Sequence, residues 1–246
     1  MTPDFLLLAN GRRLAYHRVA GGAPGVVFLG GFRSEMTGTK ASFLDAWARA
    51  RGQAFLRFDY TGHGASSGDF RDGAVGDWAR DAHDALVALT EGPQILVGSS
   101  MGGWIALLVA QRLPGRVAGL VGVAAAPDFT EDGMWAEMDE RERALLAQHG
   151  EILAPSGYGD QPYPITRRLI EDGREHLVLR DPLDLPFPVR LLHGTEDSDV
   201  PFDVALRLMA HATAEDLSLT LVKGADHRFS APGNLELLAR AVEDIL

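Results

Sequence analysis

Three residue types that together support nucleophilic acyl transfer stand far apart in this chain. Ser100 lies in the run GSSMG at 98–102, which fits the pattern G-x-S-x-G, while Asp197 lies in HGTEDSDVP and His227 in KGADHRF. A serine hydroxyl is a weak nucleophile unless a histidine takes its proton and a carboxylate orients that histidine. The three residues therefore predict a catalytic triad, with Ser100 as nucleophile, His227 as base and Asp197 as orienting acid.

Each of the three follows directly on a short apolar run that predicts a buried strand. The runs are QILVG at 94–98, VRLLH at 189–193 and LSLTLV at 217–222. The carboxyl ends of parallel strands meet at one edge of a sheet, where open sheets hold ligands. The chain order Ser, Asp, His is also the order expected when the serine stands on a strand-to-helix turn. Two rival acids, Glu196 and Asp199, are predicted to lie on the loop surface.

The glycines around Ser100 have a steric explanation. A sharp turn that pushes the serine hydroxyl outwards is strained, and side chains at Gly98 and Gly102 would collide with the neighbouring strand and helix. An oxyanion hole also needs two backbone N–H groups near the nucleophile. We expect these from Met101 and from Phe32 in FLGGFRSE. Gly31 in that loop is expected to let the backbone approach the substrate.

Other glycine-rich runs fit nucleotide-binding patterns poorly. GHG at 62–64 lacks the third glycine of a dinucleotide loop, so a tight turn is predicted, with His63 structural or lining the site. GTK at 38–40 lacks the upstream glycine of a phosphate loop. The chain has no metal-ligand spacing such as H-E-x-x-H. No cofactor and no metal are therefore predicted.

Strand-like and helix-like runs alternate along the chain, which predicts an α/β fold with a mostly parallel sheet of about eight strands flanked by helices. Asn10-Gly11 predicts a hairpin between the two opening strands. The further predicted strands lie at 5–8, 13–19, 25–29, 54–58 and 117–123, and the predicted helices at 40–50, 75–89, 101–113, from near 201 and from 234.

About sixty residues between two predicted strands interrupt this alternation, far more than a usual connection. We expect a helical lid at about 127–185, with one helix at 132–148 and another at 165–174. Met134, Trp135 and Met138 in the first helix are expected to bind substrate, since a Met-rich apolar surface accepts an acyl chain. Ordinary packing of the lid onto the core is the alternative. Tyr158 and Tyr163 add aromatic surface to this segment.

Composition narrows the class of protein. The 246 residues, with 46% hydrophobic residues and no low-complexity tract, predict one domain at 1–246, with its core at 1–126 and 186–246. A net charge of −11 argues against a nucleic-acid partner. The absence of Cys excludes disulfides and a cysteine nucleophile. No apolar stretch predicts stable membrane insertion, and no signal peptide is expected at the start, so a cytoplasmic protein is expected. The oligomeric state stays open.

These motifs together resemble the α/β-hydrolase family. GGFRSEMTGTKA, LRFDYTGHGASSG, GPQILVGSSMGGW and HGTEDSDVP more narrowly resemble the abhydrolase-domain enzymes of mitochondria and their bacterial relatives. Those enzymes are described as palmitoyl-protein thioesterases and acyl-glucuronide esterases. The resemblance implies an esterase or thioesterase that acts on a small-molecule or acyl-protein substrate. The lack of a mitochondrial presequence favours a bacterial, cytoplasmic member.

Two other classes of function remain compatible with the sequence. The same triad could serve an aminopeptidase, a lactonase or a carbon–carbon hydrolase. Alternatively, the chain could be a ligand-binding module without turnover, although such a module has no need to keep Ser100, Asp197 and His227 together.

Overall fold

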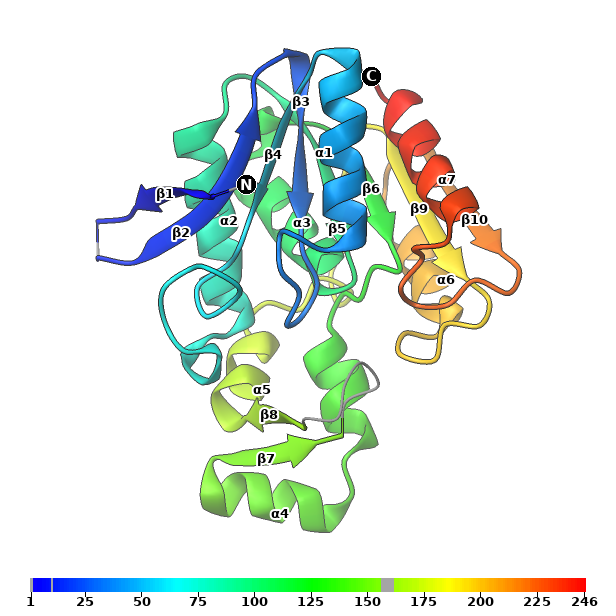
Figure 1. Cartoon of the computed structure of the whole chain (residues 1–246). Helices are drawn as coiled ribbons and strands as arrows, with labels where there is room; N and C mark the ends of the chain where they lie inside the picture. The colour runs from blue at the N-terminus through cyan, green and yellow to red at the C-terminus, as the bar shows by residue number, and fades with distance from the viewer. Residues whose placement is uncertain (1, 10, 156–161) are drawn as a thin grey trace.

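The structure, a computed structural model, describes residues 2–9, 11–155 and 162–246. Its main feature is a sheet of eight strands in the order β1-β2-β4-β3-β5-β6-β9-β10 (Figure 1). Only the pairings β1–β2 and β2–β4 are antiparallel. The predicted mostly parallel eight-stranded sheet is thereby confirmed. The strands are β1 (Asp4–Leu7), β2 (Arg13–Val19), β3 (Gly22–Leu29), β4 (Gln53–Phe58), β5 (Gln94–Ser99), β6 (Val117–Val123), β9 (Val189–Gly194) and β10 (Leu217–Val222).

Helices cover both faces of this sheet. Helices α1 (Thr39–Arg51) and α7 (Pro232–Glu243) pack on one face, and their buried residues share a core cluster with Phe28, Ile95 and Val121. The other face is covered by α2 (Val75–Leu89), α3 (Met101–Arg112) and α6 (Phe202–His211). Strand β5 is buried along its whole length, as expected of an apolar strand at the centre of a covered parallel sheet. Burying each such large aliphatic side chain contributes about 1.5–3 kcal/mol.

The opening hairpin agrees with the prediction in its strands. Strands β1 and β2 pair antiparallel, and Gly11 adopts a φ of +80°. Asn10, the other predicted turn residue, lies outside the described residues.

The long connection between β6 and β9 lies beyond the carboxyl ends of the parallel strands (Figure 1). We call residues 124–188 the β6–β9 segment. It contains a π-helix (Thr130–Trp135), α4 (Glu140–His149), the antiparallel pair β7 (Glu151–Ala154) and β8 (Tyr163–Thr166), and α5 (Arg167–Arg174). The helix predicted at 165–174 is confirmed only from Arg167 onwards, because Thr166 caps α5 by accepting the Leu169 N–H. Tyr158 lies outside the described residues.

The single helix predicted at 132–148 is wrong. The chain forms the π-helix, leaves the helical path at Met138 and Asp139, and starts α4 at Glu140. Asp139 Oδ1 accepts the Glu142 N–H at 2.7 Å, and Glu142 Oε2 accepts the Asp139 N–H at 2.9 Å. This reciprocal capping box starts a new helix inside the predicted one.

Asp128 anchors the beginning of the β6–β9 segment to its end. Its side chain is 0% exposed, and its carboxylate accepts the N–H groups of Val178 at 2.8 Å and Leu179 at 3.0 Å. Arg180 donates to the same carboxylate at 3.1 Å. Burial raises the pKa of Asp128, although these hydrogen bonds oppose the shift. The two ends of the segment are thus tied together beside the core.

Candidate active site

Ser100 occupies the turn between β5 and α3. Its backbone lies at φ 55° and ψ −121°, a conformation that costs an L-residue about 1–3 kcal/mol. A Cβ at Gly98 would lie 2.4 Å from the Gly102 carbonyl oxygen, and a Cβ at Gly102 would lie 2.0 Å from the Leu29 carbonyl oxygen. Side chains at both positions would therefore collide with the helix and the neighbouring strand, as predicted. The glycines permit the turn that presents the serine.

The structure brings Ser100, His227 and Asp197 into one hydrogen-bonded chain. His227 Nε2 lies 3.0 Å from Ser100 Oγ, and His227 Nδ1 lies 2.8 Å from Asp197 Oδ2. A carboxylate can only accept, so Nδ1 carries the proton and Nε2 is the acceptor for the Ser100 hydroxyl. The Asp197 side chain is 0% exposed and that of His227 is 15% exposed. The geometry can pass the hydroxyl proton from Ser100 to His227.

The loops that carry Asp197 and His227 are bound to each other. The Thr195 N–H donates to the Val222 carbonyl at 3.0 Å and the Glu196 N–H to the Ala225 carbonyl at 3.0 Å. Gly194 is required at this crossing, because a Cβ there would lie 2.1 Å from the Ala225 carbonyl oxygen. Two strand ends are thereby held close enough for their side chains to pair.

The electrostatics of Asp197 favour the carboxylate. Burial alone would raise its pKa, but hydrogen bonds from His193 and His227 outweigh burial and lower the pKa of Asp197. Asp197 Oδ1 also accepts the N–H groups of Asp199 at 3.0 Å and Val200 at 2.8 Å. Glu196 and Asp199 themselves are exposed, as predicted for the two rival acids.

The loop after β3 passes directly beside Ser100. A Cβ at Gly31 would lie 3.4 Å from Ser100 Cβ, so a side chain at this position would crowd the reacting hydroxyl. Phe32 follows Gly31, and Met101 is the first residue of α3. The two residues expected to supply oxyanion donors therefore lie next to residues that contact or adjoin Ser100, and their role stays a prediction.

The side chain of His63 binds the backbone of this loop. It is 3% exposed in the tight turn at 62–64, where Gly62 and Gly64 have φ values of +77° and +46°. Its Nδ1 lies 3.3 Å from the Thr61 carbonyl, and its Nε2 accepts the Arg33 N–H at 3.2 Å. These partners require a neutral ring with the proton on Nδ1. Burial, opposed by the hydrogen bond with Thr61 and assisted by the nearby charge of Arg33, lowers the pKa of His63 to about 4.

Aromatic side chains from four parts of the chain meet at Phe32. Its ring makes edge contacts with those of Phe70, Trp78, Phe129 and Tyr163, with centroids 4.9, 5.9, 5.7 and 5.7 Å away. We call these five residues the aromatic cluster. Such edge-to-face pairs contribute about 0.5–1.5 kcal/mol each beyond area burial. The cluster joins the loop beside Ser100 to the β6–β9 segment.

The three predicted substrate-binding residues of the β6–β9 segment differ in their surroundings. Met138 is 7% exposed within a small core of this segment, which favours ordinary packing at this position. The Trp135 ring is covered by the guanidinium groups of Arg143 and Arg174, 4.9 and 4.6 Å from its centroid. Met134 packs against both the main core and the small one.

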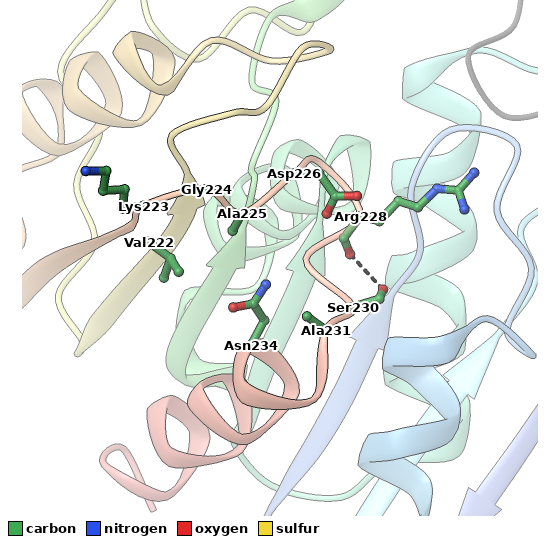
Figure 2. Close-up of a pocket in the computed structure, with 9 residues that line it drawn as sticks. All are labelled: Val222, Lys223, Gly224, Ala225, Asp226, Arg228, Ser230, Ala231 and Asn234. Carbon is green, nitrogen blue, oxygen red and sulfur yellow. Dashed lines mark hydrogen bonds between the residues drawn. The ribbon is translucent and has the colours of Figure 1, made fainter.

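A groove of about 470 Å³ lies at the carboxyl end of β10. Figure 2 shows that it is formed by the loop after β10 and the start of α7, where Ser230 donates to the Arg228 carbonyl at 2.9 Å. Its lining contains none of Ser100, Asp197 and His227. Asp226 and Arg228, the sequence neighbours of His227, do line it, so the groove adjoins the loop that carries His227.

Neither a metal cluster nor a membrane span is found where the structure describes the chain. No group of three or more His, Asp or Glu side chains among the described residues could hold a metal ion. Within the same ranges, no helix is long and apolar enough to cross a membrane.

The fold and the serine turn define a class of protein, and comparison with known families identifies the same one. Residues 26–240 match the Alpha/beta hydrolase family, and the chain belongs to this family. The predicted α/β-hydrolase fold and the resemblance to abhydrolase-domain enzymes are confirmed.

Particular relatives cover nearly the whole chain. It is 36% identical over 246 residues to the rat palmitoyl-protein thioesterase ABHD10, mitochondrial (Rattus norvegicus), covering 100% of this chain and 82% of the rat protein. The crystal structure of a protein from Agrobacterium vitis S4 superposes on this chain with a TM-score of 0.93 at 41% sequence identity. The match covers 100% of this chain and 97% of the Agrobacterium chain. The mouse alpha/beta hydrolase domain-containing protein 10 superposes with a TM-score of 0.92 at 34% identity, covering 100% and 98%.

The cytoplasmic location expected from the sequence is contradicted by these relatives. The rat, mouse and bovine proteins are all named as mitochondrial. The expectation depended on the first residues of the sequence alone. We withdraw it.

Proposed function

We propose that this protein is a serine hydrolase that cleaves acyl esters or thioesters. The observation that carries the proposal is the hydrogen-bonded chain from Ser100 Oγ through His227 to Asp197, with distances of 3.0 and 2.8 Å. Membership of a hydrolase family supports the reaction class. The relatives named palmitoyl-protein thioesterase support a thioester of a longer acid, carried by a small molecule or a protein.

The arrangement performs acyl transfer in two steps. Ser100 Oγ attacks the acyl carbonyl carbon while His227 Nε2 takes the hydroxyl proton, and Asp197 stabilises the imidazolium that results. The N–H groups of Phe32 and Met101 donate to the oxyanion as it develops. The carbon–sulfur or carbon–oxygen bond then breaks, and the leaving thiolate or alkoxide receives the proton from His227. Water repeats the sequence on the acyl-enzyme and releases the acid.

The substrate side of the proposal follows from Gly31 and the aromatic cluster. Gly31 has no side chain, so the loop backbone passes close to Ser100, and Phe32 next to it contacts Phe129 and Tyr163 of the β6–β9 segment. We infer that the acyl chain lies against this apolar wall. The β6–β9 segment would then act as a lid that shields the acyl-enzyme from water.

Covalent labelling tests the proposal with a matched pair of variants. A fluorophosphonate probe should label the wild-type protein and Ser99→Ala, whereas Ser100→Ala should remain unlabelled. Ser100→Ala should also lower kcat for p-nitrophenyl butyrate and octanoyl thioesters on the order of 10⁶-fold. Its melting temperature should stay near that of the wild type, because a hydroxyl on the turn adds little packing.

Two outcomes would contradict the proposal. Labelling that persists in Ser100→Ala would place the nucleophile elsewhere. A wild-type protein that is neither labelled nor active on esters and thioesters would favour a binding module. Activity confined to aminoacyl amides or lactones in the same substrate panel would replace the proposed substrate class while keeping the triad.

A further inference from the structure

A second histidine contacts the carboxylate of Asp197. His193 lies near the end of β9 and is 0% exposed. Its Nε2 lies 3.2 Å from Asp197 Oδ2 and 2.8 Å from the Val200 carbonyl oxygen. The same Oδ2 pairs with His227 Nδ1 at 2.8 Å. Two imidazole rings therefore meet at one carboxylate oxygen.

The hydrogen-bond partners of His193 determine where its proton lies. The Val200 carbonyl can only accept, so His193 Nε2 must carry a hydrogen, which is then shared with Asp197. His193 Nδ1 is buried without a hydrogen-bond partner among the described residues. A proton on that atom would be left unsatisfied in the core, so the ring is neutral with its proton on Nε2. His193 is thus a donor to Asp197.

This donor completes the set of contacts that hold the carboxylate. Asp197 Oδ1 is fixed by the N–H groups of Asp199 and Val200. On the Oδ2 side, the other donor is His227, which has to remain free to exchange protons with Ser100. A donor that is independent of the reaction therefore keeps Oδ2 in place while His227 gains and loses its proton.

We propose that His193 is a positioning residue, which holds Asp197 Oδ2 towards His227 Nδ1 and so keeps His227 Nε2 directed at Ser100. The inference depends on the proposed function, since it concerns the efficiency of that triad. The competing explanation is purely structural: His193 would only fix the loop after β9 through the Val200 carbonyl. The two explanations differ in whether the effect of His193 requires Asp197.

A double-mutant cycle with a rescue variant separates the two explanations. His193→Phe and His193→Asn remove the donor at the Nε2 position, whereas His193→Gln places an amide N–H near it. His17→Phe is the control, because His17 is another buried histidine, on β2 rather than near the site. Each change is made in the wild type and in Asp197→Ala, and kcat, KM and melting temperature are measured with p-nitrophenyl butyrate.

In the wild-type background we expect His193→Phe and His193→Asn to lower kcat about 10- to 100-fold, the loss expected for a hydrogen bond to a charged group. KM should change less than about twofold, since the substrate does not touch His193. His193→Gln should regain most of the lost kcat, and His17→Phe should keep it. In the Asp197→Ala background the same His193 changes should alter kcat less than about twofold, because contacting residues that act together are not additive.

An equal fold-loss of kcat in both backgrounds would overturn the inference in favour of the structural explanation. Wild-type kcat in a folded His193→Phe or His193→Asn protein would also overturn it, as would His193→Gln as inactive as His193→Phe at a similar melting temperature. Two loss variants are included so that one poorly folded protein does not decide the result. A wild-type protein without esterase activity would instead refute the proposed function itself.

Discussion

At the scale of single residues, Asp197 differs from the other acids of its loop by the contacts of its carboxylate. It accepts hydrogen bonds from two backbone N–H groups and from His227, and His193 Nε2 lies 3.2 Å from its Oδ2. Asp197→Asn should keep the loop folded but present an amide that favours the wrong tautomer of His227. We expect kcat for p-nitrophenyl butyrate to fall on the order of 10⁴-fold.

Asp199 provides the matched control for this change. It contributes only its backbone N–H to the site, and its side chain is exposed. Asp199→Asn should therefore leave kcat within about twofold of the wild type, since surface substitutions away from special features have small effects. A larger loss in Asp199→Asn than in Asp197→Asn would mean that the acid has been assigned to the wrong residue.

His63 predicts a specific dependence of stability on pH. Its pKa is lowered to about 4 in the folded state, chiefly by burial, from an ordinary value of 6.5. Between these two values the unfolded chain binds a proton that the folded protein does not bind. The free energy of unfolding therefore falls as pH decreases from about 6.5 to about 4, by roughly 1.4 kcal/mol per pH unit for this one group.

Comparison with His63→Gln isolates this contribution from other titrating groups. Urea unfolding at pH 7.5, 5.5 and 4.5 should show the wild type losing stability faster than His63→Gln as the solution becomes acidic. Parallel pH dependence in the two proteins would show that His63 does not titrate as its burial indicates.

At the scale of elements, strand ends could be predicted from the sequence because apolar runs and glycines are local signals. The runs that gave β5, β9 and β10 also placed Ser100, Asp197 and His227 at one sheet edge. Helix 132–148 was wrong for a local reason as well: Asp139 and Glu142 form a capping box inside a helical hydrophobic pattern.

The contacts that support these residues could not be predicted in the same way. His193 stands four residues before Asp197 in LLHGTED, but no sequence pattern shows that its ring lies against that carboxylate. Likewise, the meeting of Phe32 with Phe129 and Tyr163 depends on how the β6–β9 segment returns to the sheet. Residue types and strand ends thus predicted which three side chains the structure brings together, whereas their supporting contacts required the folded chain.

Substitution of Asp128 tests how firmly the two ends of the β6–β9 segment are held together. Asp128→Ala removes the acceptor for two buried N–H groups and should destabilise the protein by about 2–5 kcal/mol. For a domain of this size the melting temperature should then fall by roughly 4–20 °C. Asp128→Asn, which keeps one acceptor oxygen and tolerates the φ of +59° at this position, should lose about half as much. Equal melting temperatures for the wild type and Asp128→Ala would refute this anchoring role.

At the scale of the whole molecule, the sheet carries the three residues of the proposed triad, and the β6–β9 segment contributes Phe129 and Tyr163 to the aromatic cluster. The Ala126 N–H donates to the Ser100 carbonyl at 3.1 Å, so the segment begins beside Ser100. Phe129 follows three residues later and contacts Phe32. An acyl chain bound to Ser100 would therefore meet residues from both parts of the fold.

This arrangement predicts that kcat/KM rises from acetate through butyrate to octanoate esters. A fully buried methylene contributes about 0.8 kcal/mol, or roughly fourfold per carbon at most. Phe129→Ala should lower kcat/KM for octanoate several-fold more than for acetate, because the long chain loses part of its wall. Trp135→Ala should lower both equally, since two guanidinium groups already cover that ring and its loss weakens the segment as a whole. The opposite pattern, with Trp135→Ala selective for octanoate and Phe129→Ala not, would place the acyl chain on the π-helix and away from the aromatic cluster.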